Sequence, residues 1–305
     1  MDIWQAVLIT VVTAATPLLI AALGELVVER AGVLNLGLEG MMAVGASCGF
    51  AAATLSGSSL VGVLAAIAAG AALSALFALL VLGLATNQVA SGLALTIMGL
   101  GLSGLIGAGF VGSGREAIPP IRIPGLSDLP AVGRLVFGED PFVYLSLALA
   151  GGILWFLSRS RAGLTLRSVG ENHTSAHALG LPVIQVRLLA ILFGGACAGL
   201  AGAYLSLVYT PFWSPGMTAG RGWIALALVV FASWKPLRVL FGAYLFGGAT
   251  VLQLHAQAAS LGFPSQVMSA FPYVATIVAL VLMSLGRRKA AIAPGSLGTS
   301  FVPDR

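Results

Sequence analysis

LVGVLAAIAAGAALSALFALLVLGL, residues 60–84, decides the fold class because it holds no charged side chain over a length that can cross a membrane. The hydrocarbon core of a bilayer is about 30 Å thick, so a spanning helix needs about 20 mostly apolar residues. The whole chain has the same character. Of its 305 residues, 58% are hydrophobic and 8% are charged, whereas an ordinary soluble domain has about 25% charged residues. The sequence therefore predicts an all-α integral membrane protein.

Other apolar segments, each bounded by charges, proline or glycine, predict further spans. Together they indicate a polytopic helical bundle of about nine transmembrane segments, within a range of roughly eight to ten. Two of them, 41–55 and 222–233, are short. They are either completed by flanking residues or are broken helices that do not cross alone. The expected spans are 3–23, 41–55, 60–84, 90–112, 142–158, 183–208, 222–233, 239–258 and 272–286.

Lysine and arginine set the expected orientation, because they gather on the cytoplasmic side of membrane proteins. If segment 159–182 is cytoplasmic, four of the 15 basic residues lie outside and the other eleven lie inside. The N-terminus is then outside and the C-terminus is cytoplasmic, with a basic tail at 287–305. Residues 113–141 hold five prolines and charges of both signs, which predicts an extended, non-helical outer loop. The four outer basic residues are Arg115, Arg122, Arg134 and Arg221.

The residue sets that an enzyme or a motor needs are missing from this sequence. Neither lysine, Lys235 or Lys289, follows the glycine that a G-x-x-x-x-G-K-[ST] phosphate loop requires. His173 and His177 are spaced to share a helix face, but no third ligand accompanies them, so we expect no metal and no cofactor. The basic residues lie without aromatic interleaving, which argues against nucleic acid as a partner. We expect a protein that is not an enzyme.

Small residues recur at the spacing that brings membrane helices close together. Gly45 and Gly49 form one such pair, and Gly195 and Gly199 form a second, with Gly202 beyond it. Lipid removes the hydrophobic driving force between helices, so close packing of small residues contributes to their association. We expect these glycines to pack helices.

Polar side chains within the apolar segments are costly in hydrocarbon and usually face a cavity or a partner helix. Neutral amides suit an uncharged, hydroxyl-rich solute better than an ion. Each residue either contacts solute or only bonds between helices, and the sequence leaves both alternatives open. The candidates for the substrate pathway are Asn35, Glu39, Asn87, Gln88, Ser91, Gln253, His255 and Gln257.

Four ordered stretches carry a family resemblance: ELVVERAGVLNLGLEGMMAVGA from Glu25, TNQVASGLAL from Thr86, RSVGENHTSAHALGLPVIQVRLLAILFGGACAGLAGAYLSLVYTPFW from Arg167, and GMTAGRGWIALALVVFASWKP from Gly216. The chain resembles permease subunits in the nucleoside and simple-sugar branch of bacterial ABC importers, which are related to the ribose and branched-chain amino acid permeases. The similarity extends from about residue 15 to residue 286. The order of the motifs is most similar to the second of the two permeases that such systems usually encode.

The resemblance implies a single transmembrane permease domain over 1–305, in a multi-pass protein of the bacterial cytoplasmic membrane. It implies that the chain forms the translocation pathway for nucleosides or related ribosides, with simple sugars as the nearest alternative. The implied partners are a second permease subunit in a heterodimer, a cytosolic ATP-binding cassette ATPase that hydrolyses the ATP, and an extracytoplasmic solute-binding protein. A self-contained secondary transporter or channel is the rival class. It would need intramembrane carboxylates, and only Glu25, Glu29 and Glu39 come near a span.

The resemblance also implies a coupling helix for the ATPase within segment 159–182. The family's motif has proline where this chain has His173, which alters the start of that helix. Gly180 fits the helix end, where a left-handed residue needs no Cβ. We expect small residues such as Ala176 to insert into a cleft of the ATPase, so that Ala176→Arg abolishes transport. The implied ATPase-coupling residues are Gly170, Glu171, Asn172, Ala176, Gly180 and Leu181.

Overall fold

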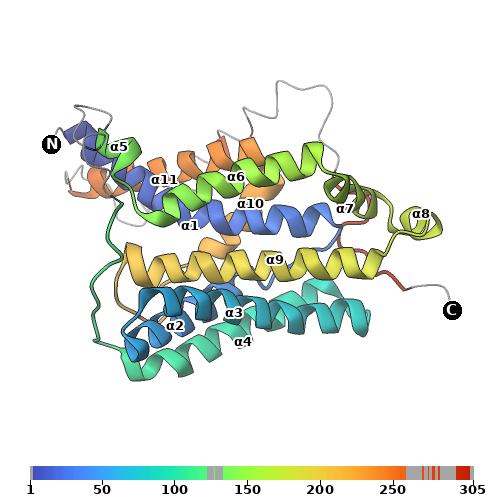
Figure 1. The fold of residues 1–305 in the computed structure, drawn as a ribbon, viewed down its shortest axis with the longest axis horizontal. Coiled ribbons are helices and arrows are strands. Elements are labelled where there is room, and N and C mark those ends of the chain that lie inside the picture. Colours follow the sequence, from blue (N-terminus) through green and yellow to red (C-terminus); the bar gives the residue numbers. More distant parts are fainter. Residues whose placement is uncertain are drawn as a thin grey trace.

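The computed structural model is a helical bundle whose long helices lie side by side (Figure 1). It describes residues 3–121, 127, 133–258, 270, 274, 277, 278, 281 and 293–302. Seven of the described helices are long and apolar enough to cross a membrane. These are α1 (Ile3–Arg30), α2 (Leu38–Ser56), α3 (Ser59–Ala78, extended by the π-helix Leu79–Gly83), α4 (Gln88–Gly107, extended by the 3₁₀ turn Ala108–Phe110), α6 (Pro141–Arg159), α9 (Val183–Tyr204, extended by the π-helix Leu205–Tyr209) and α11 (Pro236–Ala258).

The expected count of nine spans is not confirmed, and the two short segments differ from each other. Flanking residues complete the segment 41–55 into α2, which has 19 residues. The segment 222–233 contains α10 (Arg221–Phe231), whose 11 residues extend about 16 Å and cannot cross a bilayer alone. Most of the last expected span, 272–286, lies outside the described residues.

Capping side chains fix where several helices begin. Asp140 accepts hydrogen bonds from the backbone N–H groups of Phe142 (2.8 Å) and Val143 (3.2 Å) at the start of α6, and Asn87 does the same for Ala90 (3.0 Å) at the start of α4. Such caps satisfy helix-end donors that have no partner within the helix.

The segment expected to be a non-helical outer loop contains no helix over residues 113–121. Within the described residues there is no strand, but Gly114 forms an isolated antiparallel bridge with Phe212. The backbone N–H of Arg115 also donates to the carbonyl of Pro211 at 2.9 Å. The expectation was wrong at one point, because α5 (Gly133–Phe137) is a short helix.

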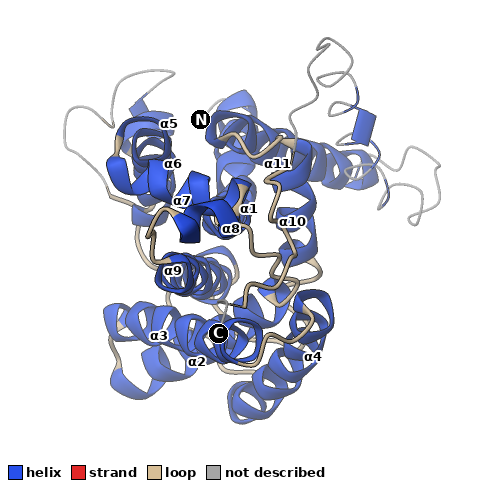
Figure 2. Ribbon diagram, turned by 90° about the vertical axis from the view of Figure 1, so that its right-hand side faces the viewer, coloured by secondary structure: helices blue, strands red, loops and turns tan. Residues whose placement is uncertain are grey.

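Helices α1 and α9 lie at the centre of the bundle (Figure 2). Close contacts between glycines bring α9 against its neighbours, as the spacing predicts. A Cβ on Gly45 of α2 would lie 2.5 Å from the Cα of Gly199, and one on Gly70 of α3 would lie 2.7 Å from the backbone nitrogen of Gly199. Larger side chains would force these helices apart.

The two ends of the bundle carry different elements (Figure 1). The start of α1 and α5 lie at one end, whereas α7 (Arg161–Glu171), α8 (His173–Ala178) and the C-terminal residues lie at the other. The expected coupling segment and the described C-terminal residues 293–302 are therefore on the same side.

Candidate functional site

Two short helices protrude from the end of the bundle that holds the expected coupling segment (Figure 1). Ser160 caps α7 by accepting a hydrogen bond from the N–H of Gly163 at 2.9 Å. Asn172 caps α8 in the same way for Ser175, also at 2.9 Å. Beyond the end of α8, Gly180 has φ +79°, a left-handed conformation that favours glycine. Residues 160–180 therefore form two capped helices that end in a left-handed turn, and not an open loop. We call the corner formed by α7 and α8 the coupling corner.

Two of the expected coupling residues hold this corner to the rest of the chain. Gly170 packs directly on the backbone carbonyl of Arg30, so that any Cβ at this position would clash with it. Ala176 is 3% exposed and packs with Val169, Val183 and Phe301. The expectation that Ala176 presents its small side chain to a partner needs correction, because a bulky residue there would first disrupt the packing of α8 within this chain.

The exposed side of the corner is formed by other residues. Leu179, one residue after α8, is 81% exposed and lies outside the helices that are long enough to cross a membrane. Leu181 is half-buried. The exposed residues of this corner, which we call the coupling surface, are Glu171, Asn172, Thr174, Ser175, His177, Ala178, Leu179 and Gly180.

The C-terminal residues 293–302, which we call the tail segment, pack on the coupling corner. The backbone N–H of Ser296 donates to the carbonyl of Gly170 at 2.9 Å, and the Ser296 hydroxyl accepts from the backbone N–H of His173 at 3.0 Å. The ring of Phe301 lies 5.2 Å from that of His173 and 5.3 Å from that of His177, measured between centroids. A proline at position 173 would have no N–H to donate to Ser296. The position where this chain has histidine in place of the family's proline is therefore also a contact with the tail segment.

Arg187, in the first turns of α9, ties the tail segment to the bundle and was not singled out from the sequence. It is fully buried. Its guanidinium donates to the carbonyls of Ala31 (3.2 Å) and Thr299 (3.1 Å) and to Nδ1 of His173 (3.3 Å). The sequence does give one indication of this role, which is the position of Arg187 at the start of a mostly apolar helix. A charged side chain that is buried there needs polar partners.

The imidazole of His173 is the acceptor in this contact. Burial, and then the positive charge of Arg187, lower its pKa below the usual value. Because a guanidinium can only donate, Nδ1 of His173 must be unprotonated to receive the bond. The contact therefore holds His173 in its neutral form.

Four of the expected pathway residues form hydrogen bonds within this chain near the start of α2 and α4. Asn35 accepts from the N–H of Gly37 at 3.0 Å. Gln88, 1% exposed, accepts from the N–H of Leu34 at 2.8 Å and donates to the carbonyl of Thr299 at 3.2 Å. Asn87 caps α4, as described above, and the hydroxyl of Ser91 lies 2.8 Å from that of Thr86. These bonds build the fold, and contact with a solute stays a prediction.

Glu39 joins two helices that begin inside the bundle. One carboxylate oxygen accepts from the N–H of Gly220 at 2.9 Å, and the other accepts from the N–H of Gly222 at 2.6 Å. The side chain is 4% exposed. It therefore places its negative charge at the N-terminus of the short helix α10, where unpaired backbone donors favour an anion.

The last three pathway candidates, Gln253, His255 and Gln257, lie on α11 with partly or fully exposed side chains. His255 contacts the carbonyl of Val251 through Nδ1 at 2.9 Å. The structure does not bring these three residues into contact with the other five.

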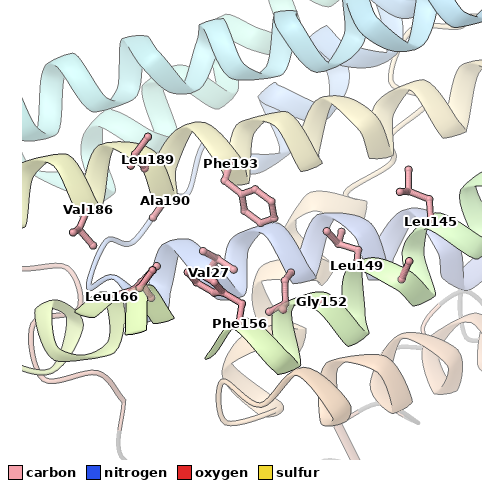
Figure 3. A pocket seen from close by; sticks show the side chains of 13 residues that line it. Val27, Leu145, Leu149, Gly152, Phe156, Leu166, Val186, Leu189, Ala190 and Phe193 are labelled. Carbon is pink, nitrogen blue, oxygen red and sulfur yellow. The ribbon is translucent and has the colours of Figure 1, made fainter. Parts of the chain in front are cut away.

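A groove of about 600 Å³ lies between α1, α6, α7 and α9 (Figure 3). Val27, Leu149, Phe156 and Phe193 are among the side chains that point into it. All its lining residues are apolar or glycine, so no side chain there can hydrogen-bond a hydroxylated solute. The groove suits hydrocarbon instead.

These features define a multi-pass helical membrane protein with two short helices, α7 and α8, at one end. The chain belongs to the family described as the permease component of branched-chain amino acid transport systems, whose model matches residues 7–285. It is a permease subunit of an ABC transporter from the nucleoside and sugar branch.

Three relatives are similar over most of their length. The putative glucose ABC transporter permease protein TsgC13 of Haloferax volcanii is 44% identical over 291 residues, which cover 88% of each chain. The guanosine ABC transporter permease protein NupQ of Bacillus subtilis is 34% identical over 321 residues, covering 99% of each. NupP, a second guanosine permease of that bacterium, is 26% identical over 90% of this chain and 80% of its own. No solved structure matches the chain.

Proposed function

We propose that this permease forms half of the membrane channel of an importer for nucleosides or related ribosides, driven by a separate ATPase. The observation that carries the proposal is the coupling surface. Leu179 is 81% exposed on a corner that Gly170 and Ala176 anchor firmly to the bundle. The sequence has no phosphate loop, so the work of ATP hydrolysis must arrive through protein contact, and a fixed corner with an exposed apolar side chain suits that contact.

The remaining partners and the orientation follow from the same proposal. A second, different permease would complete the channel, and the resemblance to both NupP and NupQ of one bacterium supports such a heterodimer. A solute-binding protein would deliver solute outside. The bias of basic residues supports a cytoplasmic position for α7, α8 and the tail segment, with the N-terminus outside. Gln253, His255 and Gln257 stay proposals for contact with solute.

Simple sugars are the second candidate substrates. The 44% identity to a putative glucose permease is higher than the 34% identity to NupQ, and it favours this alternative. Both solutes are neutral and rich in hydroxyl groups, which agrees with the amides found in the spans.

Uptake into proteoliposomes tests the proposal. The vesicles would contain this chain, its second permease and its ATPase, with the solute-binding protein added outside and labelled guanosine or glucose as the probe. ATP-dependent accumulation of guanosine is expected, and accumulation of glucose alone would support the second candidate. Accumulation that needs only an ion gradient, with the ATPase omitted, would overturn the proposal in favour of a secondary transporter.

A further inference from the structure

A second, smaller cavity of about 260 Å³ lies between α2, α4 and the segment 213–218 that leads into α10. Its lining differs from that of the apolar groove, because it combines an indole ring with hydroxyl groups and a thioether. Segment 213–218 ends two residues before Gly220, whose N–H is held by Glu39. The cavity therefore lies next to the point where the short helix α10 begins inside the bundle.

The indole ring of Trp213 is fixed in one wall of this cavity. It is 2% exposed and packs flat enough on α4 that a Cβ on Gly107 would overlap the carbons of the ring. Only glycine at 107 leaves room for the ring in this position. Trp213 is therefore a rigid element of the wall.

The N–H of this ring has no acceptor among the described residues. Nε1 of Trp213 is completely buried and forms no hydrogen bond. A buried donor without an acceptor is costly, and buried tryptophan N–H groups usually find a partner. The ring is thus a donor that a molecule in the cavity could satisfy.

The hydroxyl groups in the lining supply the complementary acceptors. Ser103 of α4 donates its proton to the carbonyl of Ala43 at 2.8 Å, which leaves the lone pairs of its oxygen free to accept. Ser214 and Thr218 add two further hydroxyls. None of the lining residues is charged, so the cavity suits a neutral molecule.

We propose that this cavity is a contact site for the sugar ring of the transported solute. An oxygen of a furanose or pyranose ring, or one of its hydroxyls, would accept from Nε1–H of Trp213, and another hydroxyl would donate to Ser103. This chemistry is common to nucleosides and to free sugars. The inference rests on the proposed function, which it deepens by naming the part of the solute that the permease contacts.

Fluorine NMR of the purified chain, labelled with 5-fluorotryptophan, tests the contact directly. The chain has five tryptophans, whose signals are assigned by replacing each with phenylalanine. Uridine, ribose and glucose serve as probes, so that the arms separate a nucleoside from a free pentose and a free hexose. We expect a saturable shift of the Trp213 signal with at least one probe, and no shift for Trp155, which is 63% exposed on α6. An unchanged Trp213 signal with all three probes overturns the proposal.

Uptake by the complete transporter separates this inference from the proposed function. Trp213→Phe keeps an aromatic ring and removes only the N–H, while Ser103→Ala removes the acceptor. For each variant we expect uptake at low solute concentration to fall about 3- to 10-fold, the usual effect of one neutral hydrogen bond, with unchanged retention of the ATPase. Trp155→Phe is the matched control. If the wild-type transporter carries neither guanosine nor glucose, the proposed function fails. If it carries either one and both variants match it, the sugar contact alone fails.

Discussion

Replacing Phe301 by alanine tests whether the tail segment is held on the coupling corner by this one side chain. Phe301 is 7% exposed and contacts Ala176, Val183 and the rings of His173 and His177. Truncating a buried phenylalanine costs about 3–5 kcal/mol in a core. We take about 3 kcal/mol, because the tail segment can relax where a core cannot. Every 1.4 kcal/mol is a factor of ten, so release of the tail should become about 100-fold more frequent.

Hydrogen exchange measures this release at named amides. The N–H of Ser296 is bonded to Gly170, and the N–H of His173 is bonded to Ser296, so both should exchange about 100-fold faster in Phe301→Ala if local opening controls exchange. Val302→Ala is the control, because Val302 is 63% exposed and should change neither rate. Unchanged protection at Ser296 and His173 in Phe301→Ala would refute the packing described for the tail segment.

Three further variants test other parts of the structure. Burial, and then the neighbouring Asp140, raise the pKa of Glu139 to about 7. Between about pH 4.5 and 7 the carboxyl of Glu139 is therefore protonated in the folded state but ionised in the unfolded state. The free energy of unfolding should fall as the pH rises through that window. Glu139→Gln should flatten this dependence and stabilise the protein at pH 8 by about 1–3 kcal/mol, as thermal unfolding in detergent at several pH values would reveal. Gly199→Leu should separate α9 from α2 and α3 and cost at least about 3 kcal/mol, whereas Gly151→Leu, with open space around its Cβ, should leave the melting temperature nearly unchanged. Glu39→Gln removes one of the two carboxylate oxygens that accept from the N–H groups of Gly220 and Gly222. We expect the free energy of unfolding to fall by about 1–3 kcal/mol. An unchanged melting temperature would argue against these two hydrogen bonds.

Hydropathy was enough to predict the helical class and most of the spans, because each long apolar helix must satisfy its own backbone in lipid. It could not decide whether 222–233 crosses. The start of α10 inside the bundle is fixed by a contact between distant residues, the carboxylate of Glu39 on the N–H groups of Gly220 and Gly222. The glycine pairs were predictable because their spacing on one helix already implies a close neighbour.

The short helix within segment 159–182 was predictable from the sequence and the family resemblance, whereas the direction of its side chains was not. Ala176 and Leu179 are three residues apart, and no local pattern reveals that a tail segment more than 100 residues later covers the first and leaves the second exposed. The same is true of Arg187, whose acceptors come from three separate parts of the chain. Long-range contacts of this kind are set by packing and not by sequence periodicity.

Leu179→Asp provides the most direct test of the account, since it asks whether the coupling surface transmits the work of a separate ATPase. The matched control is Leu55→Asp, because Leu55 near the end of α2 is 80% exposed, almost the same as Leu179 at 81%. Burying a leucine contributes about 1.5–3 kcal/mol, and an unpaired charge would add to its loss. The amount of ATPase that co-purifies with Leu179→Asp, and ATP-driven uptake with it, should therefore fall at least about tenfold, while Leu55→Asp retains both. Full retention of the ATPase and normal uptake in Leu179→Asp would contradict the account.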